Sequence, residues 1–249
     1  MAQVRQTPVL IVENRGLVRI VALNRLDKLN ALDTELTQAL HDALQDADHD
    51  AVVRAIVLTG NGRAFCAGAD LSEFKQLTPA NQDLVERRAD LTCRTQAMMQ
   101  KLSKPIVSAV RGAAVGGGAG LAIGCDMMVA GSDLKFGYPE LKHSIVPALV
   151  MTGLQRSLGR KAAFEMISLG RLIGAEEALK LGLANRMVEP DQVVETAVAI
   201  AEQWAAANPR AMAAVKSLYY QVADLPYDEA MAAGRYVNAA MRAFREDET

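Results

Sequence analysis

Short apolar runs alternate with amphipathic stretches along the first part of the chain. Two β-type runs, residues 9–13 and 17–23, flank Asn14-Arg15-Gly16, a sequence typical of a hairpin turn. Asp33 is a suitable N-cap for the helix that follows. The apolar stripe of that helix comprises Leu36, Leu40, Ala43, Leu44 and Ala47. We therefore expect a β-hairpin followed by an amphipathic helix.

Three further apolar runs predict buried strands in the middle of the chain. The runs are residues 53–59, 106–110 and 127–129. A polar helix is predicted at residues 81–102, between the first two runs, and a glycine-rich turn opens another helix near Gly116. Strands that alternate with helices in this way are typical of a parallel sheet, so we predict an α/β core.

The pattern beyond Thr152 is mostly helical. Helices are predicted at residues 152–158, 161–169, 175–181, 191–207, 210–222 and 227–244, and one strand at residues 184–188. No flexible linker or low-complexity tract marks a second autonomous unit. We therefore predict a core at residues 1–189 and a helical C-terminal region at residues 190–249 that is not an independent domain.

The composition is that of a folded globular protein, because hydrophobic residues make up 51% and charged residues 22% of the 249 positions. The 27 Lys and Arg side chains nearly balance the 29 Asp and Glu side chains, and aromatic residues make up only 4%, so we expect no nucleic-acid partner. No apolar run approaches the roughly 20 residues of a membrane span, so no membrane association is expected. Cys66, Cys93 and Cys125 show no metal-binding spacing and favour reduced thiols in a cytoplasmic protein without a metal site.

Common nucleotide-binding and hydrolase motifs are absent from the sequence. The run Gly116-Gly117-Gly118-Ala119-Gly120 fits G-x-G-x-x-G in no register, and neither a P-loop nor a G-x-S-x-G motif occurs. Two loops that follow predicted strands remain, residues 63–71 and 111–121. Ligands of parallel α/β proteins bind at such strand ends, and a helix that begins in a glycine run presents N–H groups to an anion or a developing oxyanion. Tight helix–strand packing without a ligand explains the glycine run equally well.

Five motifs, in order along nearly the whole chain, resemble those of the crotonase (enoyl-CoA hydratase/isomerase) superfamily. They are NRLDKLNAL at residues 24–32, FCAGADL at 65–71, the glycine-rich segment at 112–126, FGYPE at 136–140 and a helix–strand element at 173–188. One such motif would be weak evidence, whereas five at the family's spacing are specific. The resemblance implies an α/β fold of the crotonase type, a spiral of ββα units with a helical C-terminal region. It also implies assembly as a homotrimer or a dimer of trimers.

The same resemblance implies the residues of an acyl-CoA site. It places the thioester oxygen between the backbone N–H groups of Ala69 and Gly117, where negative charge builds up during reaction at the α- or β-carbon. The CoA-binding residues that it implies are Ala67, Asp70 and Leu71 for the adenine, and Arg25 and Lys28 for the phosphates. A solvated surface charge is an equally good interpretation of the last two side chains. Coenzyme A is then part of the substrate, and no separate cofactor is expected.

Glu140 occupies the position of one of the two glutamates that hydratases of this superfamily use, but Gly120 occupies the other. Water addition needs one group to activate water and another to deliver a proton to the α-carbon, whereas moving a double bond needs a single base. Isomerisation by Glu140 alone is therefore an alternative. Residues 146–150, however, resemble a segment of members that act as hydratases, and hydration of a 2-enoyl-CoA to a 3-hydroxyacyl-CoA is the leading hypothesis. His143 is a weaker candidate base, and Asp126 is predicted to be a structural cap.

A third hypothesis comes from another class of protein. A protein that keeps this fold but has no catalytic activity would be a scaffold or an RNA-binding protein. The near-neutral charge and the presence of Ala69, Gly117 and Glu140 in their motifs argue against this interpretation.

Overall fold

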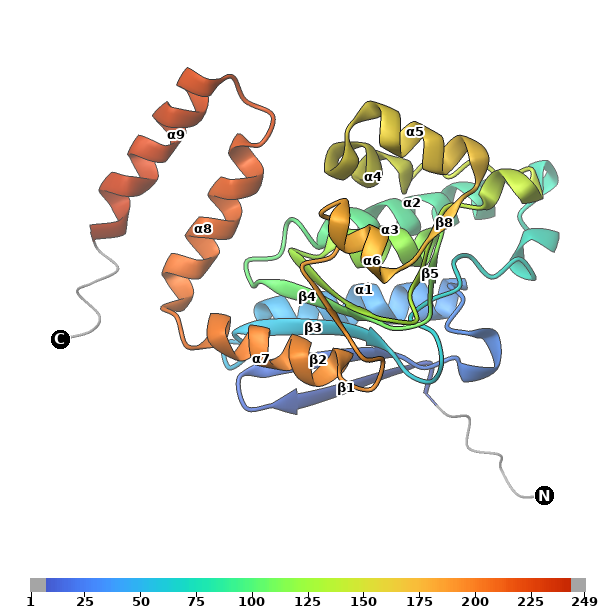
Figure 1. Ribbon diagram of the computed structural model, residues 1–249, viewed down its shortest axis with the longest axis horizontal. Coiled ribbons are helices and arrows are strands. Elements are labelled where there is room, and N and C mark those ends of the chain that lie inside the picture. The colour runs from blue at the N-terminus through green and yellow to red at the C-terminus, as the bar shows by residue number, and fades with distance from the viewer. Residues whose placement is uncertain (1–7, 243–249) are drawn as a thin grey trace.

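A six-stranded sheet forms the centre of the computed structural model, which describes residues 8–242 (Figure 1). Its strands, in spatial order, are β1 (Leu10–Arg15), β2 (Val18–Leu23), β3 (Ala55–Gly60), β4 (Ile106–Val110), β6 (Met127–Gly131) and β9 (Arg186–Val188). β1 pairs with β2 in antiparallel orientation, and every other neighbouring pair is parallel. The predicted parallel α/β core is therefore confirmed.

The N-terminal hairpin and the helix after it also form as expected, with one small difference. The turn between β1 and β2 consists of residues 16–17 rather than 14–16, and Gly16 has a positive φ of 58°. A glycine adopts this left-handed conformation without strain. The side chain of Asp33 accepts a hydrogen bond from the backbone N–H of Leu36 at 2.8 Å and so caps α1 (Thr34–His49).

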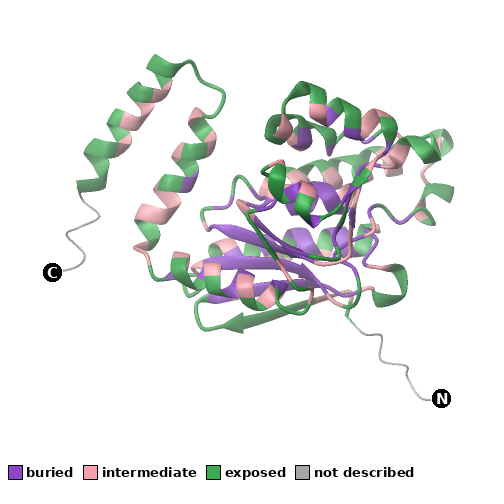
Figure 2. Cartoon of the chain, viewed as in Figure 1, coloured by how far each residue is buried: buried purple, intermediate pink, exposed green. Residues whose placement is uncertain are grey.

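Helices cover both faces of the central sheet, which explains why its inner strands are apolar at most positions. In β3, Ile56 and Leu58 belong to the core that α1 shares, whereas Ala55 and Val57 belong to the core beneath α7 (Val193–Ala205). Side chains of a strand alternate between the two faces, so two covered faces require a continuous apolar run. In Figure 2 these strands are among the buried parts of the molecule.

A second, three-stranded sheet has no counterpart among the predicted elements. It consists of β5 (Ala113–Val115), β7 (Lys135–Gly137) and β8 (Leu172–Ile173). β5 and β7 are parallel, and β7 and β8 are antiparallel. Strands of two or three residues are too short to show a hydrophobic period, and this is why the sequence pattern does not reveal them. Because β5 pairs with β7, this sheet places the start of the helix that follows β5, at Gly117, beside the turn that follows β7.

The remaining helices divide into a layer that covers the sheets and a hairpin that stands away from it (Figure 1). The layer contains α2 (Gln82–Met98), α3 (Gly117–Gly124), α4 (Met151–Leu158), α5 (Arg160–Leu169) and α6 (Ala175–Lys180). The hairpin is α8 (Pro209–Val222) and α9 (Tyr227–Ala240). The expected end of the last helix at Phe244 lies outside the described residues.

Asp126 attaches α8 to the core. Its carboxylate accepts hydrogen bonds from Lys216 Nζ and the Tyr220 hydroxyl, both at 2.8 Å, and from the Ile106 N–H at 2.7 Å. Lys216 is the one residue of α8 that is buried. Asp126 is structural, as predicted, but it anchors α8 rather than capping α3.

Candidate active site

The loop that follows β3 is held in place by a partly buried network of charges. One guanidinium nitrogen of Arg25 lies 2.9 Å from a carboxylate oxygen of Asp33 and 2.9 Å from one of Asp70. The Ser72 hydroxyl and backbone N–H both donate to Asp70, at 2.7 and 3.0 Å. Hydrogen bonds from Ser72 and the charge of Arg25 lower the pKa of Asp70 to about 2, so it is ionised at neutral pH. The network fixes the loop at Asp70, directly after Ala69.

The first turn of α3 approaches this loop closely, and the approach requires glycine at Gly118, where a Cβ would overlap the Cys66 carbonyl oxygen. Gly116 has a φ of 53°, a conformation that favours glycine, and its N–H donates to the Gly137 carbonyl at 2.9 Å. A Cβ at Gly117 would lie 4.0 Å from the backbone nitrogen of Ala69, and one at Gly68 would lie 3.8 Å from the backbone nitrogen of Gly117. The amides of Ala69 and Gly117 are therefore neighbours.

Neither of these two amides donates a hydrogen bond to another group within residues 8–242. Their neighbours do: the Leu32 N–H donates to the Gly68 carbonyl at 2.7 Å, and the Asp70 N–H donates to the Leu32 carbonyl at 3.0 Å. Ala69 and Gly117 both line a cavity of about 640 Å³. Two adjacent N–H donors at a cavity wall, one of them in the first turn of a helix, are suited to bind an oxygen that becomes negatively charged.

Glu140 lies beside this pair of amides, in the turn after β7. Its carboxylate packs against Gly116 so closely that a Cβ there would be 2.6 Å from Oε1. Oε2 is buried and has no hydrogen-bond partner among the described residues. Burial raises the pKa of Glu140, although its own backbone N–H and the charge of His143 oppose the rise. A carboxyl group with a raised pKa is protonated more often near neutral pH and is suited to proton transfer.

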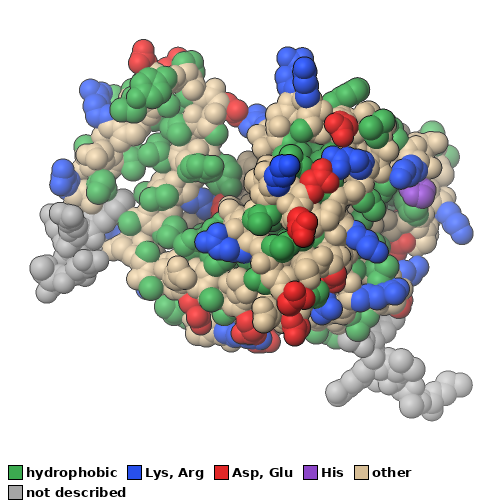
Figure 3. All heavy atoms as spheres, in the orientation of Figure 1, with side chains coloured by type: hydrophobic (Ala, Val, Ile, Leu, Met, Phe, Trp, Pro, Cys, Tyr) green, Lys and Arg blue, Asp and Glu red, His purple; other side chains and the backbone are tan. Residues whose placement is uncertain are grey.

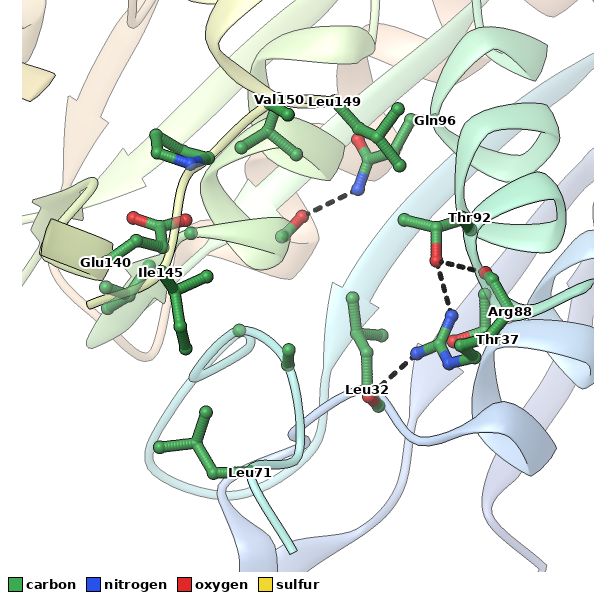
Figure 4. A pocket seen from close by; sticks show the side chains of 18 of the residues that line it. Leu32, Thr37, Leu71, Arg88, Thr92, Gln96, Glu140, Ile145, Leu149 and Val150 are labelled. Carbon is green, nitrogen blue, oxygen red and sulfur yellow. Dashed lines mark hydrogen bonds between the residues drawn. The ribbon is translucent and has the colours of Figure 1, made fainter. Parts of the chain in front are cut away.

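The cavity is lined mainly by apolar side chains from five parts of the chain (Figure 4). Those that line it include Leu32, Leu71, Phe74, Leu77, Val85, Leu121, Ile145, Leu149 and Val150. Its polar lining includes Glu140 and, on α2, Arg88, Thr92 and Gln96. Arg88 is already bound, since it donates to Thr92 Oγ1 and to the Leu32 carbonyl and pairs with Glu73. This shape and lining suit an apolar chain that carries a reactive polar end.

The structure brings together the residues that the sequence assigned to catalysis and separates some of those assigned to CoA. Ala67 and Leu71 line the same cavity as the catalytic candidates Ala69, Gly117 and Glu140. His143 also lines it and is exposed to solvent. The role of each of these residues toward a substrate stays a prediction.

Arg25, Lys28 and Asp70 do not line the cavity. The side chain of Arg25 is only 14% exposed and is occupied by carboxylates and a backbone carbonyl of its own loops. Asp70 is 7% exposed and binds that arginine. These contacts indicate that both side chains position the loop. Lys28 is exposed at the end of a 3₁₀ turn, Leu26–Lys28, and no ion pair or hydrogen bond of its side chain occurs within residues 8–242. Contact of the three residues with CoA stays a prediction.

Gln96 is a residue of the site that sequence reasoning missed. Its amide nitrogen donates to the Gly117 carbonyl at 2.9 Å, and its side chain lines the cavity. Gln96 lies in a polar helix and in none of the five motifs, so no signal in the sequence distinguishes it.

Two unpartnered amides beside a half-buried carboxyl group, in an apolar cavity, are typical of enzymes that stabilise an oxyanion while they move a proton. Within residues 8–242, no group of three or more His, Cys, Asp or Glu side chains is arranged to hold a metal ion. The chain belongs to the enoyl-CoA hydratase/isomerase family, whose model matches residues 13–245. The resemblance that the motifs carry is thereby confirmed.

Individual relatives agree with this assignment. The 2,3-dehydroadipyl-CoA hydratase of Escherichia coli is 35% identical over 91% of this chain and 87% of its own length. The short-chain-enoyl-CoA hydratase of Clostridium acetobutylicum is 34% identical over 89% of this chain and 85% of its own. The crystal structure of an enoyl-CoA hydratase from Mycobacterium smegmatis superimposes with a TM-score of 0.88 at 31% identity, over 94% of this chain and 91% of that one. The predicted crotonase fold is confirmed. Within the described part of the chain, no helix is both long and apolar enough to cross a membrane.

Proposed function

We propose that this protein adds water to a 2-enoyl-CoA and forms the 3-hydroxyacyl-CoA. The observation that carries the proposal is the position of the Glu140 carboxylate, packed against Gly116 beside the amides of Ala69 and Gly117. The relatives named as hydratases, at about a third identity over most of their length, support hydration over isomerisation.

The proposed reaction uses the two amides and the single carboxyl group together. The N–H groups of Ala69 and Gly117 bind the thioester oxygen, which becomes negative as water attacks the β-carbon. One oxygen of Glu140 gives its proton to the α-carbon while the other oxygen takes a proton from the attacking water. The carboxyl group thus ends in the state in which it began. Since coenzyme A is part of the substrate, this reaction requires no further cofactor.

The experiment that tests this function offers the purified protein two substrates. Crotonyl-CoA reports hydration, and a 3-enoyl-CoA reports movement of the double bond into conjugation. We expect 3-hydroxybutyryl-CoA from the first substrate, at a rate well above any isomerisation of the second. Isomerisation without hydration would contradict the proposal and favour the single-base alternative. Inactivity of the folded protein on both substrates would favour the scaffold hypothesis.

We also propose that the chain forms a homotrimer or a dimer of trimers, as the resemblance implies. The support is the α8–α9 hairpin, which leaves large apolar side chains in solvent (Figure 3). Its exposed apolar residues include Val215, Tyr219, Tyr227, Met231 and Tyr236. Such a surface is typical of an interface. Light scattering after size-exclusion chromatography tests this, and we expect Met231→Asp to shift the protein toward monomer. A monomeric wild-type protein would contradict the proposal.

We also propose that the protein is located in the cytoplasm. Cys66, Cys93 and Cys125 are all free thiols, and the first and last are buried, as is usual for proteins of a reducing compartment. Fractionation of cells tests the location, and recovery of the protein in an extracellular or membrane fraction would contradict it.

A further inference from the structure

Gly120 stands where the resemblance places a second glutamate, and another helix fills the space beside it. A Cβ at Gly120 would lie 2.7 Å from Oε1 of Gln96 and 2.8 Å from Cγ1 of Val150. Gln96 comes from α2, and both side chains line the cavity (Figure 4). A neutral amide therefore occupies the region in which a carboxylate is missing.

The orientation of this amide follows from its hydrogen bond. The Gly117 carbonyl can only accept a hydrogen bond, so the amide nitrogen of Gln96, which lies 2.9 Å from it, must be the atom that faces it. The amide oxygen is therefore turned away from Gly117. No group within residues 8–242 donates a hydrogen bond to this oxygen. It is an acceptor at the cavity wall, held in place by the nitrogen of the same amide.

Glu140 contacts the N-cap position of α3, Gly116, and Gln96 contacts Gly120 in the first turn of the helix. The Gly120 N–H donates to the Gly116 carbonyl at 3.0 Å, the hydrogen bond of one helical turn. The Gly116 position is in contact with the Glu140 carboxylate, and the Gly120 position is in contact with the Gln96 amide. Figure 4 shows the two side chains facing the same hollow from opposite sides.

We propose that Gln96 is a positioning residue whose amide oxygen holds the attacking water, in place of the missing carboxylate. The inference rests on the proposed hydration and adds the side chain that orients the attacking water. The water gives one hydrogen as a hydrogen bond to Gln96 and keeps it. It gives the other hydrogen as a proton to Glu140, and its oxygen forms the bond to the β-carbon. Gln96 neither gains nor loses a proton.

Two substitutions of Gln96 test this role. Gln96→Met keeps a side chain of similar length without a strong acceptor, and we expect kcat for crotonyl-CoA to fall about ten- to a hundredfold because the water is no longer directed. KM should change less than about threefold, since the acyl contacts remain. Gln96→Glu places a titratable acceptor next to the water, so its kcat should show an ionisation at low pH that the wild-type profile lacks.

Two glycine variants test the same role with Gln96 intact. In Gly120→Ala the new methyl group meets the amide oxygen at 2.7 Å and Val150 Cγ1 at 2.8 Å. It displaces the amide oxygen, so kcat should fall at least as far as in Gln96→Met. The matched control is Gly124→Ala on the same helix, whose Cβ meets nothing closer than Met99 Cε at 3.7 Å. It should keep wild-type kcat.

The outcomes separate this inference from the function on which it rests. If the wild-type protein does not hydrate crotonyl-CoA, the proposed function fails. If the wild-type protein hydrates it and Gln96→Met stays within about threefold of wild-type kcat, the water-holding role is wrong. The role is equally wrong if Gln96→Glu shows the wild-type pH profile, because then the amide only supports the Gly117 carbonyl. Should Gln96→Met not fold, the comparison of Gly120→Ala with Gly124→Ala decides, and equal kcat values would overturn the inference.

Discussion

Removal of the Gly117 N–H tests the oxyanion site with little disturbance of the helix. Gly117 is the first residue of α3, and its N–H makes no hydrogen bond within the described residues. Proline is well tolerated at this helix position, where it deletes an N–H that bonds to no protein group. The residue before it, Gly116, has a ψ of −117°, outside the α region that a following proline disfavours. Gly117→Pro should therefore fold.

The size of the effect comes from comparison with a matched variant. Gly117→Ala introduces the same first carbon, 3.1 Å from Leu32 Cδ1, but keeps the N–H. The ratio of the two kcat values thus removes the effect of the Cβ and leaves the effect of replacing the N–H by the proline ring. Loss of one oxyanion donor costs about 2.7–4 kcal/mol of activation free energy, so we expect Gly117→Pro to be about 10²- to 10³-fold slower than Gly117→Ala.

The assay is hydration of crotonyl-CoA under saturating substrate, with thermal melts and butyryl-CoA binding measured for both variants. Binding should be similar in the two, because the donor acts mainly on the charge that develops during the reaction. A folded Gly117→Pro with kcat within about tenfold of Gly117→Ala would refute the assignment of this amide.

Three further predictions concern the residues around the site. Glu140→Gln should melt at a higher temperature than the wild type at pH 8, because burial raises the pKa of Glu140 in the folded state and its charged form opposes folding. The difference in melting temperature should vanish as the pH falls below the pKa of an unfolded glutamate, and a difference that stays constant with pH would contradict this. Asp70→Asn should melt at a lower temperature than the wild type at neutral pH, and the difference should shrink as the pH falls from about 4 toward 2, because the folded-state pKa of Asp70 is about 2. Equal melting temperatures at pH 7 would count against a stabilising role of the Arg25 network. Gly116→Ala should lower both the melting temperature and kcat, since its Cβ would meet Glu140 Oε1 at 2.6 Å and its φ is 53°; an unchanged kcat would show that the carboxylate acts from another position.

The parts of the fold that the sequence predicts are those with a long, regular hydrophobic pattern. The strands β2, β3, β4 and β6 are buried on both faces and appear as apolar runs, and α1 shows its stripe together with its cap. The second sheet has strands of three residues or fewer, which form because the polypeptide around them is already placed. Tertiary contacts decide such strands, and no local pattern encodes them.

The candidate site likewise contains residues that the sequence predicts and residues that only the structure reveals. Glu140, Ala69 and Gly117 lie in motifs that mark them in the sequence, and the structure brings them together. The structural role of Arg25 is not visible in the sequence, because one of its carboxylate partners, Asp70, lies 45 residues away. Gln96 is likewise 21 residues from Gly117, and only the packing of α2 on α3 brings the two together.

Hydration of crotonyl-CoA by Glu140→Gln tests the central claim most directly. The amide keeps the shape of the side chain but cannot transfer a proton. In deuterated water, the wild-type protein should place one solvent deuterium on the α-carbon of the product. Glu140→Gln should reduce kcat by about a thousandfold while butyryl-CoA binding changes little. A folded Glu140→Gln protein that binds butyryl-CoA and keeps kcat within tenfold of the wild type would contradict the account.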